Sequence, residues 1–554
     1  MVRILISLLL IFTSWEIIAQ SVYAPLSPDY YHIVDREEVL NKNFSPYLHS
    51  SYKPYRRSSI AASMDSIGRN SPNKDYIQTD NWEYVSDSLA ISRKPFWKWF
   101  YRTKSDMLLV DQKDFMLKVS PVLYLSAGSD SNNESSPYIN TRGLEMRGMI
   151  DDKIGFYTMV GENQAMFPSY VTDYIYTQGA VPNEAFWKKF GDDGGVDFFT
   201  ARGYFTFQAT RHIGIQFGHD KNFIGNGYRS LVLSDFSAPS TFLKLHTQIW
   251  RIQYTNLYTE LVADAPWSSF GNNGTEAFPK KFMTAHHFSW NVTDNFNLGV
   301  FETIIFNRGD SIGSAFEWNY LNPIIFYRSI EQFTGSPDNA LFGMDFKWNI
   351  TKGVQLYGQG LLDEFSAAEL KAGNGWWGNK YSIQLGGKYY NALGIDRLDL
   401  QGEYNMSRPF TYAHESIFTS FSHYNQPLAH PLGANFQELV GIVRYQPIKN
   451  LFLTAKAIYS DYGTDPVDSI SYGGDPRKDY NIRLSEYDHS VGQGVANIQM
   501  MLDLNVSYMI KQNLFVDLRH IYRKRDSDDP SLDLTTNYTS LSFRLNIGLR
   551  DFGF

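Results

Sequence analysis

The sequence predicts an all-β fold, a transmembrane antiparallel β-barrel of about 18 strands preceded by a small N-terminal periplasmic segment. Three observations lead to this prediction. Long segments alternate between apolar and polar residues, short turns and long polar connections follow one another, and no apolar stretch after residues 1–19 is long enough for a membrane helix. A chain that crosses a bilayer without helices must close its strands into a barrel.

The clearest alternation lies at residues 539–550, with the period of two that a strand imposes. The apolar face comprises Thr539, Leu541, Phe543, Leu545, Ile547 and Leu549, and the polar face Ser540, Ser542, Arg544, Asn546, Gly548 and Arg550. We expect the apolar face to contact lipid and the polar face to line the lumen. The sequence then reaches Phe552-Gly553-Phe554, and a final strand with an aromatic end is typical of the outer-membrane assembly signal.

Short turns join pairs of alternating segments, as hairpin turns do. They are Asp151-Asp152-Lys153, Thr293-Asp294-Asn295, Thr351-Lys352-Gly353, Ile448-Lys449-Asn450 and Lys511-Gln512-Asn513. Long polar connections such as 408–435 and 461–494 lie between the hairpins, and this asymmetry is typical of outer-membrane barrels. The predicted strands are 115–127, 139–150, 153–163, 199–210, 212–219, 241–249, 250–263, 280–292, 295–307, 341–350, 353–364, 380–390, 395–407, 436–446, 450–461, 495–510, 513–523 and 536–550.

The amino-acid composition excludes some classes of function for this chain. The chain has 554 residues, 16% aromatic residues, no Cys and a net charge of −8. Without Cys there is no disulfide, thiolate metal site or lipidated Cys, and the absence of a basic stripe argues against a nucleic-acid partner. Residues 1–19 have the basic start and short apolar run of a signal peptide. We therefore expect a signal peptide at 1–19, a periplasmic segment with short helices at 20–114, and the barrel at 115–554.

The 20–114 segment lacks sustained alternation and contains an aromatic and basic patch at Phe96-Trp97-Lys98-Trp99-Phe100-Tyr101. One interpretation of the patch is a plug or partner-docking surface. The other is an anchor at the membrane interface, which the aromatic content favours.

Several motifs together resemble the capsule assembly Wzi family of outer-membrane proteins. One runs from His219-Asp220-Lys221-Asn222 through Gly225-Asn226-Gly227 to Ser234-Asp235, and a second comprises Asn322-Pro323 and Asp338-Asn339. The stretches from Arg408 to His414 and from Tyr424 to Phe436 resemble the branch of the family in the Bacteroidetes, which includes the gliding motility protein RemB. The resemblance covers roughly residues 110–554.

The resemblance implies an eighteen-stranded barrel in the outer membrane of a Gram-negative bacterium, with lipid and a surface polysaccharide as its partners. It implies a lectin-like organiser of capsular polysaccharide, with long loops outside the cell. The Bacteroidetes branch implies a link to gliding or secretion machinery. The enterobacterial members carry a periplasmic helical bundle before the barrel, to which segment 20–114 shows no evident similarity.

Sugar recognition needs aromatic faces beside hydrogen-bonding side chains. The candidate polysaccharide-binding residues on the long loops are Trp376, Trp377, Arg408, Tyr412, His414 and Tyr424. For Trp376 and Trp377 a sugar platform and an interface girdle are equally good interpretations, while Trp267 fits the girdle better. We also expect the motif from His219 to Asp235 to lie on the extracellular side.

We predict no catalytic residue, metal site or cofactor. The sequence lacks the HExxH spacing and the Gly-x-Ser-x-Gly elbow. His414, His423 and His430 share one loop, but a hydrogen-bonded framework is the favoured interpretation. Three functions remain open: a non-enzymatic barrel that binds or organises polysaccharide, a porin-like diffusion channel, and an outer-membrane hydrolase based on Ser289 and His287, which share one strand face.

Overall fold

The computed structural model describes residues 20–554 except 93–94, 97–98, 134, 192–193, 266–277, 309–315 and 324–325. The predicted signal peptide, Trp97, Lys98 and Trp267 lie outside the described residues. Within the described ranges, no helix combines the length and the apolar character needed to cross a membrane.

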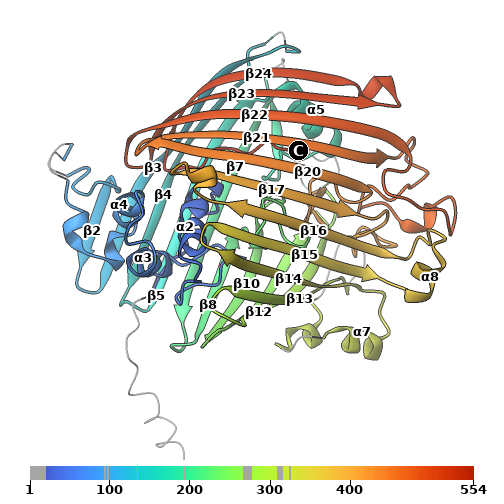
Figure 1. Cartoon of the computed structure of the whole chain (residues 1–554), viewed down its shortest axis with the longest axis horizontal. Coiled ribbons are helices and arrows are strands. Elements are labelled where there is room, and N and C mark those ends of the chain that lie inside the picture. The colour runs from blue at the N-terminus through green and yellow to red at the C-terminus, as the bar shows by residue number, and fades with distance from the viewer. Residues whose placement is uncertain are drawn as a thin grey trace, which may run out of the picture.

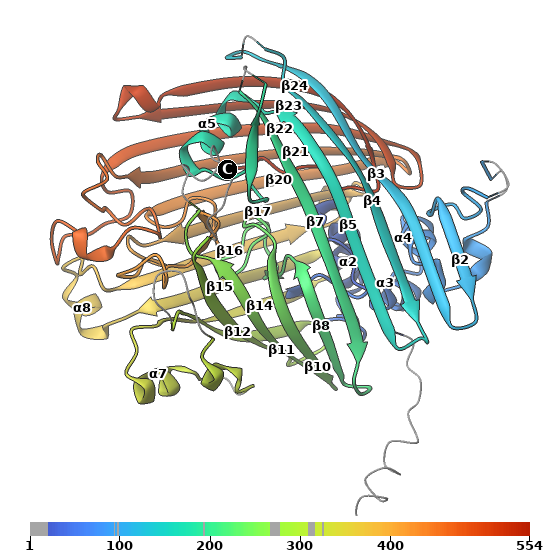
Figure 2. The same ribbon diagram turned by 180° about the vertical axis from the view of Figure 1, so that it is seen from behind.

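Eighteen antiparallel strands of the described chain close into one barrel, as predicted (Figures 1 and 2). Each strand pairs with the next along the wall, and β24 closes the seam against β3, with Leu545 opposite Leu123. The short strands β2 (Leu108–Gln112) and β6 (Trp187–Phe190) extend the sheet beside β3 and β7. The eighteen wall strands are β3 (Phe115–Asp130), β4 (Tyr138–Ile150), β5 (Ile154–Met166), β7 (Gly195–Gln208), β8 (Ile213–Asp220), β10 (Ser240–Ile249), β11 (Ile252–Val262), β12 (Lys280–Asn291), β13 (Phe296–Phe306), β14 (Asn339–Thr351), β15 (Val354–Glu364), β16 (Lys380–Tyr389), β17 (Leu398–Ser407), β20 (Phe436–Ile448), β21 (Leu451–Thr464), β22 (Val495–Lys511), β23 (Leu514–Ser527) and β24 (Leu534–Leu545).

The predicted register of the last strand is confirmed. Leu541 is 58% exposed on the outer face of β24, whereas Ser542 and Arg544 are buried inside the wall. The Arg544 guanidinium pairs with Asp517 of β23, 2.8 Å away. The inner face is therefore polar, and its charged side chains form ion pairs. The outer face is apolar, as a barrel in lipid requires.

Exposed tryptophans mark the wall near its short turns. Trp250 is 90% exposed at the turn between β10 and β11, and Trp290 and Trp348 are exposed near the ends of β12 and β14. Amphipathic aromatic side chains arranged around one end of an apolar wall are typical of a membrane-interface girdle.

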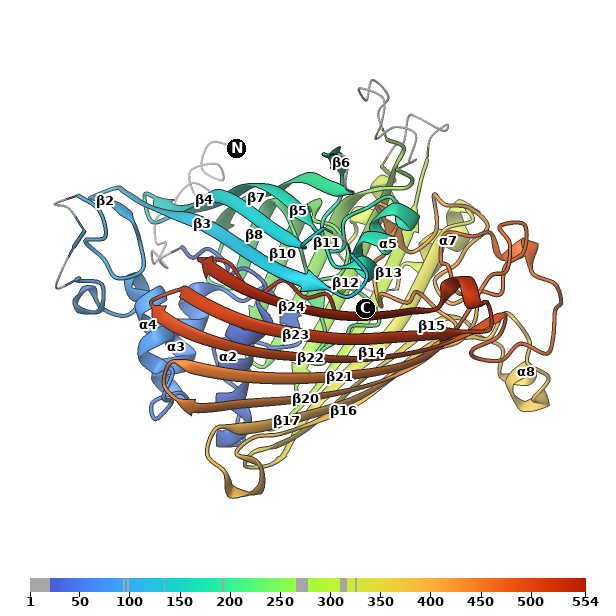
Figure 3. The ribbon, with the colours of Figure 1, turned by 90° about the horizontal axis from the view of Figure 1, so that it is seen from above.

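The N-terminal segment occupies the short-turn end of the barrel, where Figures 1 and 3 place its helices. It contains β1 (Tyr52–Lys53), α2 (Pro28–Asn41), α3 (Arg57–Ser66), α4 (Lys74–Asp80), η1 (Trp82–Tyr84) and η2 (Asp87–Leu89). Its backbone hydrogen-bonds to three of the short turns: the Gln20 N–H to Asp152, the Phe44 N–H to Asp294, and the Val39 carbonyl to the Gly353 N–H. We call residues 20–84 the plug, because they cover this end of the lumen.

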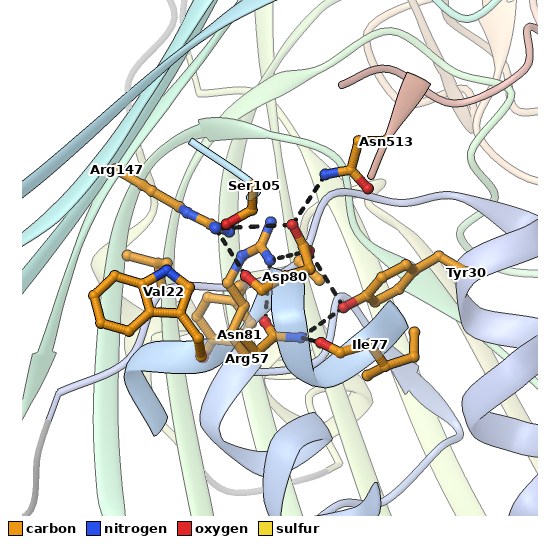
Figure 4. Close-up of polar contacts among 12 residues, drawn as sticks. Val22, Tyr30, Arg57, Ile77, Asp80, Asn81, Ser105, Arg147 and Asn513 are labelled. Atoms are coloured by element: carbon orange, nitrogen blue, oxygen red, sulfur yellow. Dashed lines mark hydrogen bonds and ion pairs between the residues drawn. The ribbon is translucent and has the colours of Figure 1, made fainter. Parts of the chain in front are cut away.

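Ion pairs attach the plug to the wall (Figure 4). Asp80 at the end of α4 accepts a hydrogen bond from Arg57 of α3 at 2.6 Å and lies 3.8 Å from Arg147 of β4. Asn513, in the turn before β23, donates to the same carboxylate. Despite its burial, the two guanidiniums hold the pKa of Asp80 well below its usual range.

The prediction that the last strand continues to residue 550 is wrong. β24 ends at Leu545, and residues 546–554 enter the lumen, where Figures 2 and 3 place Phe554. Asn546 adopts a left-handed conformation (φ 55°), which breaks the strand direction. Phe552 and Phe554 are buried against rings of the inner core rather than at the membrane edge.

Candidate functional site at the long-loop end

Long connections join the wall strands at the end opposite the plug, and some of them fill the lumen. The short elements within them are α5 (Ser169–Gln178), β9 (Phe223–Ile224), η3 (Trp318–Leu321), α7 (Arg328–Thr334), α8 (Ala367–Ala372), β18 (Ser422–His423), β19 (Gln426–Pro427), η5 (Tyr480–Ile482) and η6 (Pro530–Leu532). Two connections, 221–239 and 408–435, fold inward, so the described interior is packed with protein from both ends.

The motif from His219 to Asp235 reaches deep into the lumen. Its strand β9 pairs with β1 of the plug, with Ile224 opposite Tyr52. Asn222 accepts hydrogen bonds from Tyr52 and from Lys244 of the wall. Residues 221–235 are almost all buried in the lumen, where they join the plug to the wall, so they do not form an exposed surface loop. Their expected position on the extracellular side stays a prediction.

Glycines in this motif allow the close packing. Gly225 has φ 137°, and a Cβ there would lie 2.8 Å from the Gln359 side chain. A Cβ on Gly227 would lie 2.5 Å from the Glu403 carboxylate, which accepts the N–H groups of Tyr228 and Arg229. The glycines thus shape a structural loop.

The remaining motif residues are also structural. Asp220 lies 3.8 Å from Arg202, and the backbone N–H of Ser234 bonds to Leu428. The Asp235 carbonyl accepts from Lys221 at 2.8 Å, and burial lowers the Lys221 pKa to about 8. His219 stays at the rim, hydrogen-bonded to Thr241.

The connection 408–435 closes the lumen above this motif. Tyr412 is 1% exposed, donates its hydroxyl to the Leu231 carbonyl at 2.8 Å, and stacks on Phe421. Its ring cannot reach a ligand outside the barrel in this conformation. Tyr412 is therefore a luminal packing residue rather than part of a surface platform.

An aromatic and cationic cluster lies at the rim, where 365–379 meets 465–494. The Trp377 ring is 4.9 Å from the Tyr480 ring, and the Arg483 guanidinium lies 4.0 Å from the centroid of the Trp377 ring. Its indole N–H donates to Glu486 at 2.8 Å, and Lys380 lies 4.4 Å from the Tyr480 centroid. Partial burial raises the pKa of Tyr480 to about 12, so the phenol stays protonated at neutral pH. We call these five residues with Trp376 the rim cluster.

Arg408 and His414 lie beside this cluster. Arg408 donates to the carbonyls of Asn379 (2.8 Å) and Trp376 (3.3 Å), so it holds the tryptophan loop in place. The His414 ring packs edge-on against Tyr480 at 5.5 Å. Burial lowers the His414 pKa, which keeps the ring neutral.

Tyr424 lies apart from the rim cluster. Its backbone bonds to Val262 and its ring packs on Phe278, beside β11 and β12 rather than beside the tryptophan loop. The six predicted residues therefore divide into four near the rim cluster, Trp376, Trp377, Arg408 and His414, and two elsewhere. Sequence reasoning missed Tyr480, Arg483 and Glu486, because 461–494 showed only a long polar connection.

The histidines and serine that suggested chemistry have separate partners. His423 bonds to Val262 and Pro239, His430 to Glu438, and His414 to Thr419, so the three rings do not converge. No group of three metal-ligating side chains occurs in the described part of the chain.

Ser289 and His287 do share one strand face, but it is the luminal face. Both are fully buried; Ser289 lies 3.1 Å from Nδ1 of His49 of the plug, and His287 bonds to Asp345. No described contact joins the serine to His287, and neither faces lipid. This arrangement gives the hydrolase hypothesis no support.

The cavities between the plug, the inward loops and the wall include three with volumes of about 170, 80 and 150 Å³. Ser27 lines all three, so they adjoin one another around the segment before α2. Charged side chains such as Arg444 and Asp235 line them, and the space suits water.

No protein-family model matches the chain, and no curated protein matches it by sequence. Among solved structures, it is similar to Wzi of Escherichia coli, described as a carbohydrate-binding β-barrel of the outer membrane involved in group 1 capsule assembly. The TM-score is 0.57 at 12% identity, over 95% of this chain and 100% of Wzi. OprD of Pseudomonas aeruginosa aligns with a TM-score of 0.42 and 11% identity, over 77% of this chain and 94% of OprD. At these identities the likeness to Wzi shows a common fold, and the OprD alignment carries no argument.

Proposed function

We propose that this chain is a non-enzymatic outer-membrane barrel that binds or organises surface polysaccharide at its long-loop end. In this proposal the plug is periplasmic, the long loops are extracellular, and residues 115–554 form the membrane domain. The observation that carries the proposal is the rim cluster, which gathers aromatic rings, cations and hydrogen-bonding groups from two loops. Support also comes from the tryptophans near the short turns and from the protein-filled lumen.

The finer part of the proposal concerns the partner system. The motifs at 219–235, 408–414 and 424–436 resemble the Bacteroidetes branch that includes RemB, and we extend the proposal to a polysaccharide linked to gliding motility or secretion machinery. A spreading assay on cells that lack the chain separates this extension from capsule retention alone.

Within the rim cluster, Trp376 is the ring best placed to stack on a sugar. Trp377 is already covered by Arg483 and Tyr480, so its removal would disturb two loops. Trp376 is half-buried, and its contacts are Gly378, where a Cβ would lie 2.4 Å from the ring, and a tilted Trp377.

We expect Trp376→Ala to weaken polysaccharide binding by about two- to tenfold, which corresponds to roughly 0.5–1.5 kcal/mol for one stacked aromatic. The measurement is retention of fluorescent polysaccharide on intact cells at equal barrel abundance. The matched control is Trp250→Ala, which removes a tryptophan that is 90% exposed at the opposite end. Equal retention by both variants would contradict the proposed site.

The alternative is a porin-like channel, for which the adjoining cavities are the one structural observation. Since protein fills the lumen from both ends, we expect purified wild-type protein to give no sustained conductance steps in planar bilayers. A protein of known pore size in the same bilayer serves as the positive control. Stable steps from the wild-type chain would favour the channel.

A further inference from the structure

The long connections opposite the plug carry the negative charge of this chain. By the bounds of the wall strands, these connections are residues 131–137, 167–194, 221–239, 263–279, 307–338, 365–379, 408–435, 465–494 and 528–533. They contain 23 acidic and 11 basic residues, a net charge of −12, whereas the whole chain has −8. All other residues together therefore carry +4, so the acidity belongs to one end of the molecule.

Some of these acidic residues have a structural partner. Asp338 accepts two hydrogen bonds from Arg308, of 2.6 and 2.7 Å, and a third from the Tyr320 hydroxyl. The other residues of that motif are structural or exposed: Asn339 begins β14, and Asn322 and Pro323 lie exposed on the same connection. Asp338 therefore contributes little to the field outside the barrel.

The excess of acidic residues is greatest in the connections 465–494 and 528–533. Together they contain nine acidic and three basic residues. Asp468, Asp528 and Asp529 are exposed there. These carboxylates therefore face the solvent at the long-loop end.

Two further exposed carboxylates flank the rim cluster. Asp488 lies beside the tryptophan loop, because its backbone N–H bonds to the carbonyl of Asn374 at 2.9 Å. Glu415 follows His414, whose ring packs on the Tyr480 ring. Among the described residues, neither carboxylate has a basic side chain within ion-pair distance. A ligand at the rim cluster therefore meets uncompensated negative charge on both sides.

The two cations inside the rim cluster are already paired with carboxylates. Lys380 lies 3.1 Å from Glu364, and the lysine side chain is fully buried. Arg483 pairs with Glu486, and its side chain is only 14% exposed. An anionic group on a ligand would have to displace a carboxylate to reach either cation.

The third cation at this site, Arg408, is occupied by the backbone. Its guanidinium donates to the carbonyls of Asn379, Trp376 and His489, at 2.8, 3.3 and 3.4 Å. These bonds hold the tryptophan loop against the connection 465–494. Arg408 therefore serves the shape of the site rather than the capture of an anion.

The carboxylate inside the rim cluster stays ionised. The Glu486 side chain is 55% exposed, and hydrogen bonds from Arg483 and the Trp377 indole hold its pKa below the usual range. At physiological ionic strength the field of an exposed charge extends about 8 Å. A polymer with a carboxylate or sulfate on every repeat would bring like charges within that distance along its length, and such contacts lower affinity.

An uncharged sugar has the groups that this site can bind. The C–H groups of a sugar ring pack on an indole such as Trp376, and sugar hydroxyls donate hydrogen bonds to a carboxylate such as Glu486. A hydrogen bond to an ionised acceptor is shorter and stronger than one between neutral groups. The site therefore favours a polymer rich in hydroxyl groups over one that carries anions.

We propose that the polysaccharide bound at the rim cluster is uncharged, with hydroxyl groups and no carboxylate, sulfate or phosphate in its repeat unit. This inference rests on the proposed function, because it names the class of polymer for the same site. The acidic connections then give the site its specificity, since like-charge repulsion acts against every acidic polymer while the aromatic platform binds the uncharged one.

The test measures binding to the full chain in lipid nanodiscs, which are captured through their scaffold so that the chain is unmodified. The probes are the surface polysaccharides of the cells that make this chain, separated by anion exchange into an uncharged and an acidic fraction. We expect the uncharged fraction to be retained about fivefold more strongly than the acidic one at low salt. Trp376→Ala should lower retention of the uncharged fraction, which ties the binding to the rim cluster.

A charge variant tests the cause of the selectivity. Glu415→Gln combined with Asp488→Asn removes two negative charges beside the rim cluster, and asparagine tolerates the left-handed backbone of Asp488, with φ 67°. We expect retention of the acidic fraction, relative to the uncharged one, to rise about twofold. The matched control is Asp151→Asn combined with Asp152→Asn, which removes two exposed charges from a short turn at the opposite end and should leave the ratio unchanged.

The outcomes separate this inference from the proposed function. Equal or stronger retention of the acidic fraction, with or without added calcium, would overturn this inference and leave the polysaccharide site standing. An unchanged ratio in the Glu415 and Asp488 variant would also overturn it. Retention of neither fraction would remove the proposed function, and this inference with it. Heat-modified mobility on gels verifies that each barrel is folded.

Discussion

Replacing Asp80 by Ala is expected to lower the free energy of unfolding by about 3–5 kcal/mol, because it leaves the buried Arg57 guanidinium without its carboxylate, while Arg147 keeps Asp106 3.4 Å away. Arg57 and Arg147 are both about 4% exposed, and Asp80 is 7% exposed. The change acts on the joint between plug and wall, so trypsin should cleave the plug before the barrel unfolds. Urea denaturation in detergent and limited proteolysis measure the two effects.

Asp75→Ala is the matched control on the same helix. Asp75 pairs with Lys449 at 3.0 Å, but both side chains are more than half exposed, and such pairs contribute about 0–1 kcal/mol. Similar losses for the two variants would contradict the assignment of the joint to Asp80.

The Asp80 carboxylate makes the stability of the chain depend on pH. Its pKa is lowered in the folded chain, so its contribution to stability is fully present above the unfolded pKa of about 3.9 and is lost as pH falls through the lower folded value. We expect the stability difference between wild type and Asp80→Ala to stay constant from about pH 5 to 8 and to shrink only in strong acid. A difference that shrank between pH 7 and pH 5 would point to another group.

Replacing Leu541 by Arg is expected to destabilise the barrel by about 2–4 kcal/mol, since the side chain is 58% exposed on the outer face of β24, near the middle of the strand. Thr535→Arg is the depth control, because Thr535 is exposed on the same face at the long-loop end, where the cost falls to about 0–1 kcal/mol. Folding into lipid vesicles measures both. Equal costs would mean that the wall does not cross the bilayer in this register.

Local periodicity explains why the wall could be predicted from sequence. A strand that separates lipid from lumen must alternate, so the pattern at 495–511 appears in the sequence without knowledge of its neighbours. The predicted strands 241–249 and 250–263 are also joined by a hairpin, with Trp250 at φ 54°. Hairpin register follows once the turns are known.

The inward elements could not be predicted, because their contacts are non-local. Ile547 and Leu549 continue the period of β24, yet they pack inside the barrel, where aromatic partners come from elements hundreds of residues away. The rim cluster combines Trp377 with Tyr480 in the same way. The tryptophan pair was visible in the sequence, whereas the connection 461–494, which covers it, showed no motif that pointed to a site.

The position of residues 546–554 brings the two ends of the described chain together. They leave β24 at the short-turn end and pass beside the plug, where a Cβ on Gly548 would lie 3.3 Å from Ser27. The same tail packs on the wall, since Phe552 and Phe554 belong to its inner core. The beginning and the end of the described chain therefore share one close-packed interior, and neither the plug nor the tail can shift without disturbing the other.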